Sequence, residues 1–467
     1  MSITAELAAY AAGATFEALP APAVEAAKAV VLDVLGCAVG AAPLELTARY
    51  QAIASELGGT AGGASIITSG RKSSMGAAAF ANANAAALLD YGDGYVAKAA
   101  YLWAGTAIVP AALAVGEALG ASGTDLLSAV ATGFEVGARI SDALTFPDVK
   151  DAVRAENVAA VIAAAVAAAA IGRPDHDAML SAIGMASATM PVATLRGYIG
   201  AEAHPVRDMK QGLGWRSLLG VLAARSAAAG LRMVQPGNGL DGEHGFWDAF
   251  GALPPDPAEL LADLGRDPRI LRTHTKKHPG GGMSHGAIDL VRELLARNDV
   301  GLEQIAGIEI RLDEMLGQSA AIQSPSGPVD AQFSIPYQVA VAVSGGPEGP
   351  GWYSPETLAD KRIRALAQRI IVVADPECSE AYLKRRLFMT KARILTTSGS
   401  VVDGLLERSE RLREPRLYQA KFRDLAGQVI SPNRVEAIIQ AVDRLDSAPS
   451  LTSLAGLVRA PVRPGAA

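Results

Sequence analysis

The sequence predicts a mainly helical protein with a second, smaller α+β region, and three observations support this fold class. Alanine dominates the first half, in runs such as 163–165 and 167–170; it has the best intrinsic helix propensity and lets helices pack closely. Short β-like runs alternate with helices only after about residue 268. Helical periodicity then returns near the C-terminus. We therefore expect an all-helical domain formed by residues 1–267 and 408–467, with an inserted α+β domain at 268–407.

Apolar periodicity, and glycines that follow helix ends, locate the individual elements. In the first half we expect helices at 22–39, 74–90, 106–119, 123–144, 155–171, 177–186 and 214–229, and one short strand at 64–68. The α+β region is expected to hold strands at 270–276, 305–312, 370–373 and 392–397, and helices at 284–296, 332–343 and 354–367. Helices at 418–426 and 435–445 follow it.

Composition excludes several classes of protein. A chain of 467 residues favours two domains, and 50% hydrophobic with 19% charged residues excludes general disorder. A net charge of −6 with scattered Lys and Arg gives no basic surface for nucleic acid. Cys37 and Cys378 are the only two cysteines, which argues against a disulfide framework and suits a reducing cytoplasm. The N-terminus lacks a signal-peptide pattern, and 158–172 is too short and too weakly hydrophobic for a membrane span.

The first candidate site is the acidic end of the helix expected at 74–90. Asp90 and Asp93 are three residues apart and share a face if the helix continues, whereas Gly92 and Gly94 indicate that it ends and leaves Asp93 on a turn. Two nearby carboxylates disfavour sharing full charge, so one can hold a proton near neutral pH and act as an acid or base. The alternative is an ordinary solvated acidic turn.

The second candidate site is the segment 274–285, which contains three of the six histidines. On a strand, His274, Lys276 and His278 would alternate onto one face. The histidine spacing would permit a pair of metal ligands, but no carboxylate or cysteine lies adjacent in sequence, so we disfavour a metal site. Neither a G-x-G-x-x-G nor a P-loop pattern occurs here, which argues against nucleotide binding.

Glycines and a serine end this segment before the next expected helix. Gly280, Gly281 and Gly282 would bring backbone amides close to a ligand, and Ser284 is the expected N-cap. Bare amides at a helix N-terminus beside a lysine would bind a carboxylate. The alternative is a flexible glycine loop with surface lysines.

Further polar candidates lie outside these two segments. Lys210, with Arg207 and Arg216 nearby, places positive charge ahead of a long helix, although a solvated basic turn would look the same. Tyr337 could bind a substrate carboxylate or pass a proton, or could be an interior tyrosine with one hydrogen-bond partner.

Four stretches in order resemble the MmgE/PrpD family. They are residues 80–94, 206–216, 276–285 and 331–340, the last reading AQFSIPYQVA. The resemblance implies two-domain enzymes that eliminate, decarboxylate or isomerise small polycarboxylic acids without a redox cofactor. It also implies a homodimer, an α+β lid, and an active site in the cleft between the domains. By this resemblance the catalytic residues are Asp90, Lys210, Lys276, His285 and Tyr337.

The sequence departs from the family pattern where proton-handling residues are expected. Trp103 falls about where the family carries a histidine, and a second family histidine is missing from the region of Arg154. Gly281 stands where many members place a cysteine or histidine. We expect the substrate to be bound by Asp93, Trp103, Arg154, Gly281, Gly282 and Ser284. A tryptophan makes the pocket more apolar, which suggests a substrate with an alkyl or ring substituent.

The preferred function is therefore a cofactor-independent lyase that removes a proton α to a carboxylate, with loss of water or carbon dioxide. His204 is a weaker candidate base than Asp90 or His285. An epimerase or double-bond isomerase would share the first proton transfer. A non-catalytic paralogue that keeps the fold and the dimer is the third reading, and the missing histidines are its support. No metal or cofactor is expected, and the expected partners are a small carboxylic acid and a second copy of the chain.

Overall fold

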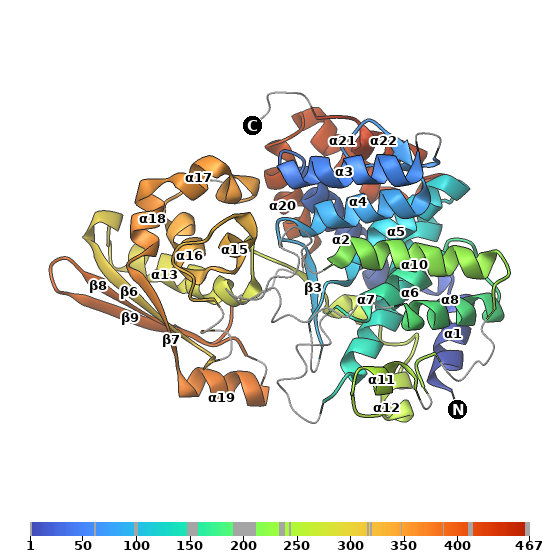
Figure 1. Cartoon of the computed structure of the whole chain (residues 1–467), viewed down its shortest axis with the longest axis horizontal. Helices are drawn as coiled ribbons and strands as arrows, with labels where there is room; N and C mark the ends of the chain where they lie inside the picture. The colour runs from blue at the N-terminus through green and yellow to red at the C-terminus, as the bar shows by residue number, and fades with distance from the viewer. Residues whose placement is uncertain are drawn as a thin grey trace.

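A computed structural model describes residues 2–59, 62–97, 101–146, 157–189, 212–232, 239–241, 244–314, 317, 320–346, 348–385, 387–409 and 414–462. Figure 1 shows the helices of the N-terminal half beside the C-terminal helices, and a sheet with its own helices on the other side. The chain is mainly helical with a smaller mixed α/β part, which agrees with the predicted fold class. The boundaries at 267 and 408 remain a prediction.

The first part consists of helices with a few very short strands. These helices are α1 (Ile3–Gly13), α2 (Ala21–Gly40), α3 (Glu45–Gly58), α4 (Met75–Ala87), α5 (Ala104–Leu119), α6 (Gly123–Ala143), α7 (Ala160–Ala170), α8 (His176–Ala188), α10 (Leu213–Ala228), α11 (Phe246–Ala249) and α12 (Pro257–Leu261). The small strands here are β1 (Ala64–Ser65), β2 (Lys72–Ser73), β3 (Asp93–Val96) and β4 (Tyr101–Leu102).

The alanine-rich helix α7 lies at the centre of this part, packed against α5, α6, α8 and α10. Small residues allow the helices to approach closely. A Cβ added at Gly137 of α6 would lie 2.6 Å from the Ala163 Cβ, and one added at Gly220 of α10 would lie 2.6 Å from the Ala164 Cβ. Such separations are possible only without side chains. The predicted tightly packed, alanine-rich core is therefore confirmed.

The C-terminal helices α20 (Pro415–Gly427), α21 (Pro432–Asp443) and α22 (Thr452–Arg459) return to the N-terminal helices. Helix α20 packs along α2. Phe422 is buried, and its ring would lie 2.9 Å from a Cβ added at Gly36 of α2. Leu425 makes a similar contact, because its side chain would lie 3.3 Å from a Cβ added at Gly40. This contact joins segments almost 400 residues apart in sequence.

A four-stranded sheet with the order β7-β6-β8-β9 forms the centre of the second part. Its strands are β6 (Ile305–Leu312), β7 (Ile370–Ala374), β8 (Thr390–Thr396) and β9 (Val401–Leu406). Strands β6 and β7 are parallel, and the other pairs are antiparallel. The helices of this part are α13 (His285–Arg297), α15 (Pro328–Phe333), α16 (Ile335–Val343), α17 (Pro355–Ala359), α18 (Lys361–Ala367) and α19 (Pro376–Arg385).

Several element predictions were wrong in detail. The strand predicted at 270–276 is a 3₁₀ turn (Arg269–Arg272) and a short strand β5 (His274–Thr275). The adjacent apolar residues Ile270 and Leu271 lie within the 3₁₀ turn, with Ile270 buried and Leu271 39% exposed. The helices predicted at 332–343 and 354–367 are each divided in two, because Ser334 and Asp360 cap new helices inside them. Helices α1, α3, α19 and α22 and strand β9 are among the elements that were not predicted.

Strand β5 pairs with β3 of the N-terminal part, with Asp93 opposite Thr275 and Gly94 opposite His274. This short ladder brings the two candidate segments of the sequence side by side.

Two further predictions concern the whole chain. Cys37 and Cys378 are both buried free thiols, in agreement with the absence of a disulfide framework. Within the described ranges, no single helix is long and apolar enough to cross a membrane; α2 and α3 pass that test only together, across a bend of 103°.

The contact between α20 and α2 predicts that Phe422 is important for stability. Phe422→Ala should lower the free energy of unfolding by about 3–5 kcal/mol, since it removes a buried ring from a close helix contact. Urea denaturation followed by circular dichroism measures this. Arg416→Ala on the exposed side of the same helix is the control. An equal, small loss in both variants would show that the C-terminal helix contributes little to the core.

Candidate active site

Asp90 lies on a tight turn directly after α4. The helix ends at Ala87, and Asp90 has a φ of 47°, in the left-handed region. Positive φ is uncommon outside glycine, although aspartate tolerates it better than most residues. On this turn the Asp90 carboxylate accepts a hydrogen bond from Lys276 Nζ at 2.6 Å, and the Asp90 carbonyl accepts a second at 3.0 Å.

The Asp90–Lys276 ion pair is buried, with side chains 4% and 2% exposed respectively. Lys276 Nζ donates its third hydrogen bond to the Gly280 carbonyl at 3.0 Å, so the three donors of the ammonium group are all used within the chain. The Trp103 ring centroid is 5.1 Å from the same Nζ, within range of a cation–π contact. Either charge buried alone would be costly, so each side chain stabilises the other.

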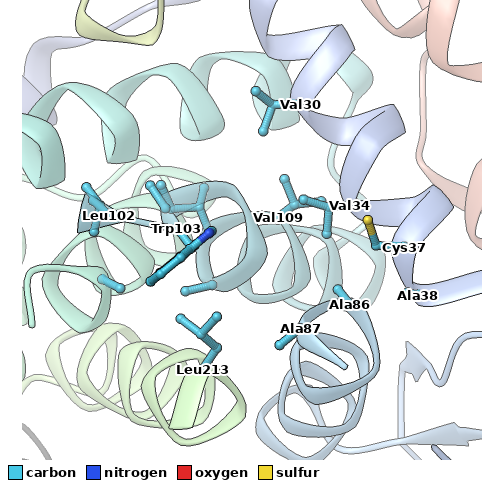
Figure 2. Packing of buried hydrophobic residues seen from close by; sticks show 14 of the residues in the cluster. Val30, Val34, Cys37, Ala38, Ala86, Ala87, Leu102, Trp103, Val109 and Leu213 are labelled. Atoms are coloured by element: carbon cyan, nitrogen blue, oxygen red, sulfur yellow. The ribbon is translucent and has the colours of Figure 1, made fainter. Parts of the chain in front are cut away.

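Three predicted site residues therefore meet here: Asp90, Lys276 and Trp103. Trp103 directly precedes α5. Its ring joins a buried apolar cluster that includes Leu102, Val109 and Leu213 (Figure 2). The cation is thus bordered by apolar groups, where its electrostatic effect is larger than in water.

The glycine loop that follows Lys276 is built against the Asp90 turn. Gly280 has a φ of 106°, and a Cβ there would lie 2.0 Å from Gln338 Nε2. The Gly280 amide donates to the carbonyls of Leu89 and Asp90, and the Gly281 amide donates to the Gln332 carbonyl at 2.8 Å. The prediction that these amides face a ligand is therefore wrong for Gly280 and Gly281. A Cβ at Gly282 would meet nothing within 4 Å.

Ser284 does not cap α13, which corrects a second prediction. Its backbone is helical and no side-chain cap bond is present. Its hydroxyl instead donates to the Gly281 carbonyl at 2.7 Å and contacts the Gln338 side-chain carbonyl. Ser284 and Gln338 thus hold the glycine loop from within the second part.

His278 is held between two carboxylates. Its Nδ1 lies 2.8 Å from Glu348 Oε2, and its Nε2 lies 2.9 Å from Asp289 Oδ1. Burial by itself would lower the pKa of His278, but hydrogen bonds to Asp289 and Glu348 and their charges outweigh it and raise the pKa. This histidine is an imidazolium in a charge network that also includes Lys277 and Arg292. It does not share one strand face with His274 and Lys276 as predicted, because β5 ends at Thr275.

His285 is the opposite case, although its ring centroid lies 5.3 Å from that of His278. Burial, the positive charge of His278 and the positive charge of Lys276 lower the pKa of His285 well below its ordinary value. It is therefore neutral at physiological pH. No described residue forms a hydrogen bond with its buried Nε2, so one ring nitrogen is left to accept or donate a proton.

Asp93 lies in strand β3 and not on a turn. It accepts a hydrogen bond from the Gly105 amide at 3.0 Å, at the N-terminus of α5. Burial and the negative charge of Asp33 raise the pKa of Asp93 to about 7, against the smaller effect of the Gly105 and Thr106 amides. A carboxyl that titrates near neutrality is thus present as predicted, but the neighbouring acid that raises its pKa is Asp33 and not Asp90.

Tyr337 is buried in α16, where its hydroxyl donates to the Trp352 carbonyl. This arrangement favours the alternative of an interior tyrosine with one partner. Tyr353 lies closer to the ion pair: its hydroxyl donates to the Pro279 carbonyl at 3.0 Å, and the charge of Asp90 contributes to its raised pKa after burial.

The remaining predicted residues Lys210 and Arg154, and the weaker candidate His204, lie outside the described residues. Among the described residues, no group of three or more histidines, cysteines or carboxylates is placed to hold a metal ion.

Comparison with known sequences covers almost the entire chain. Residues 5–256 match the sequence model of the MmgE/PrpD N-terminal domain, and residues 278–447 match that of the MmgE/PrpD C-terminal domain. The chain belongs to the MmgE/PrpD family. A cis-aconitate decarboxylase of Aspergillus terreus (strain NIH 2624 / FGSC A1156) is 25% identical over 99% of this chain and 96% of its own length. A second cis-aconitate decarboxylase of Aspergillus terreus is 24% identical with the same coverage.

Sequence reasoning missed several buried polar residues around this MmgE/PrpD site. They are Asp33, Lys421, Gln332, Gln338 and Tyr353. One signal was available: Asp33 is the single charge within the apolar run 29–39, where a charged residue needs a buried partner. The others lie on segments whose periodicity looks ordinary, and their partners are far away in sequence.

The raised pKa of Asp93 predicts a specific dependence of stability on pH. Between about pH 4 and pH 7 the folded protein retains a proton that the unfolded chain has released. The contribution of Asp93 to the free energy of unfolding is therefore present at low pH. It is lost as the pH rises through that window, by at most ~1.4 kcal/mol per pH unit. Asp93→Asn removes the titrating group. The free energy of unfolding of this variant, relative to that of wild type, should therefore be higher at about pH 8 than at about pH 5. Urea unfolding at both pH values measures this, and an unchanged difference would contradict it.

Proposed function

We propose that this protein is a cofactor-independent lyase that acts on a small carboxylic acid by proton transfer at the carbon α to a carboxylate. The observation that carries the proposal is the buried Lys276–Asp90 pair beside the neutral His285. Membership of the family, and the two cis-aconitate decarboxylases that match along the whole chain, support the same class of reaction.

The chemistry requires a cation and a proton carrier. Removing a proton α to a carboxylate, or losing carbon dioxide, leaves negative charge that spreads onto carboxylate oxygens. Lys276 is the buried cation for this charge. Its donors are engaged by Asp90 and two carbonyls, so a substrate carboxylate binds by replacing one of these acceptors. The apolar surface of Trp103 strengthens that electrostatic contact.

His285 is proposed as the proton carrier. It is kept neutral by burial and by the nearby cations His278 and Lys276, so it can accept a proton without first losing one. In a dehydration it takes the α-proton while the carbon–oxygen bond breaks and hydroxide leaves. In a decarboxylation the carbon–carbon bond breaks, carbon dioxide leaves, and the carbanion takes a proton that His285 relays from solvent, which leaves the imidazole neutral again.

The substrate is proposed to differ from the usual tricarboxylate of the family. By the family resemblance Trp103 falls about where the family carries a histidine, and its ring is part of an apolar cluster. A dicarboxylate with an alkyl or ring substituent would suit that surface. We also propose that residues 268–407 act as a lid and that the enzyme is a cytoplasmic homodimer. Lys210, Arg154 and Tyr337 stay proposed site residues, of which Tyr337 has the weakest geometric support.

Proton NMR in deuterated water tests the proposed reaction class. The protein is incubated with citrate-like, aconitate-like and alkyl-substituted dicarboxylates. Exchange of a carbon-bound proton would establish proton transfer, and new vinyl signals would establish elimination. Exchange with inversion and no elimination would instead indicate an epimerase. No exchange with any acid that raises the melting temperature would contradict the proposal and favour a non-catalytic paralogue.

The site assignment predicts that Lys276 and His285 are required for turnover. His285→Asn should lower kcat by about 10²–10⁴-fold, since it removes the proton carrier. Lys276→Met combined with Asp90→Asn removes both buried charges together, which avoids leaving one unpaired, and should cause a similar loss. Initial rates of exchange measure both effects.

Lys384→Met is the matched control for Lys276→Met, because Lys384 is a 72% exposed lysine of α19 that pairs only with its neighbour Glu380 among the described residues. It should retain wild-type turnover. Wild-type rates in the His285 variant would remove that residue from the mechanism, and wild-type rates in the double variant would remove the ion pair.

A further inference from the structure

Lys421 of the C-terminal helix α20 contacts residues that directly adjoin the candidate site. It is buried, and its Nζ lies 2.7 Å from Asp33 Oδ1 of α2. The same Nζ donates to the Tyr91 carbonyl and to the Thr275 hydroxyl, and lies 4.1 Å from the centroid of the Tyr91 ring. Its three donors are thus used by three different segments of the chain.

Two of these partners are the chain neighbours of the central ion pair. Tyr91 follows Asp90, and Thr275 precedes Lys276. The Tyr91 hydroxyl also donates to the Lys277 carbonyl at 2.9 Å. Asp33 Oδ1 accepts a further hydrogen bond from the Thr275 hydroxyl at 2.7 Å. A single ammonium group therefore ties together the backbone turn that carries Asp90 and the strand that carries Lys276.

The local structure needs such a tie. Strand β5 has only two residues, and Asp90 has a positive φ. A ladder this short is not stable alone, and a non-glycine residue in the left-handed region persists only when its surroundings fix it. Lys421 and Asp33 supply fixed points on two long, packed helices, α20 and α2.

We propose that Lys421, together with Asp33, is a positioning residue that sets the geometry of the Asp90–Lys276 pair from the C-terminal helix; this inference rests on the function proposed above. Neither residue touches the substrate. Their role is to hold Lys276 where the substrate carboxylate binds, and small displacements of such a group have large effects on rate.

The test compares a charge-free variant with a matched control. Asp33→Asn combined with Lys421→Met removes the tie without leaving an unpaired buried charge. Lys28→Met is the control, because Lys28 also joins α2 to the C-terminal segment, through Asp446 at 2.8 Å, and its hydrogen bonds within the described part of the chain go to Glu25 and Asp446, neither of which belongs to the site. Exchange rates, KM and melting temperature are measured for each.

We expect kcat of the double variant to fall about 10–100-fold, with KM changed less than about threefold. Lys28→Met should have a lower melting temperature than wild type but the same kcat. Equal kcat losses in both variants would overturn the proposal, since general docking of the C-terminal segment would then explain them. Wild-type kcat in the folded double variant would overturn it as well.

Thr275 supplies a second test if the double variant does not fold. Thr275→Val keeps the shape of the side chain but removes the hydroxyl that Lys421 and Asp33 share, while Thr275→Ser keeps the hydroxyl. The Ser variant should turn over at least about ten times faster than the Val variant. Equal rates would overturn the proposal.

A readout independent of turnover separates failure of this inference from failure of the proposed function. Buried Lys276 should resist acetylation by an amine reagent in wild type, which mass spectrometry detects residue by residue. In the double variant its labelling should increase, and in Lys28→Met it should not. If wild type catalyses no exchange, the proposed function fails, and only the labelling then tests the positioning role. Increased labelling of Lys276 in the double variant supports that role, and unchanged labelling overturns it.

Discussion

The structure around the site depends on the need to compensate buried charge. Lys276 and Asp90 are both withdrawn from water, and neither could remain so without the other. The positive φ of Asp90 and the positive φ of Gly280 bring a carboxylate and two carbonyls to one ammonium group. The Gln332 side chain donates to the Leu88 carbonyl just before the Asp90 turn, and the Gln338 side-chain carbonyl contacts the Ser284 hydroxyl at the end of the glycine loop. The strain of a positive φ at Asp90 is offset by the ion pair with Lys276, whose three ammonium donors are all used.

Buried charge is compensated a second time close to the first ion pair. Lys421 and Asp33 form a second buried ion pair, which contacts the chain neighbours of the first pair. Asp93 is an additional acid close to Asp33. If Asp93 holds its proton, two cations face two anions in this region. Burial and the negative charge of Asp33 raise the pKa of Asp93 to about 7, because a third negative charge here would be withdrawn from water and lie close to another carboxylate.

Two neighbouring histidines show how tertiary contacts decide protonation. His278 lies between Asp289 and Glu348 and is charged, whereas His285 faces that charge and Lys276 and is neutral. Residues of one type, seven positions apart, thus have opposite states. The network of His278 also joins the glycine loop to α13 through Asp289, so it orders the segment on which His285 begins the helix.

The sequence by itself determined the helical body, the later mixed α/β part, the bounds of β6 and the segments that form the site. These follow from local propensity and periodicity, which short stretches of chain contain completely. Only the tertiary structure decided that Lys421 contacts Tyr91 and Thr275, the chain neighbours of the central ion pair. It also decided that Asp33 and not Asp90 raises the pKa of Asp93, and that the amides of Gly280 and Gly281 are used internally. Each of these depends on desolvation and on partners that are distant in sequence, and no local pattern encodes which buried groups will meet.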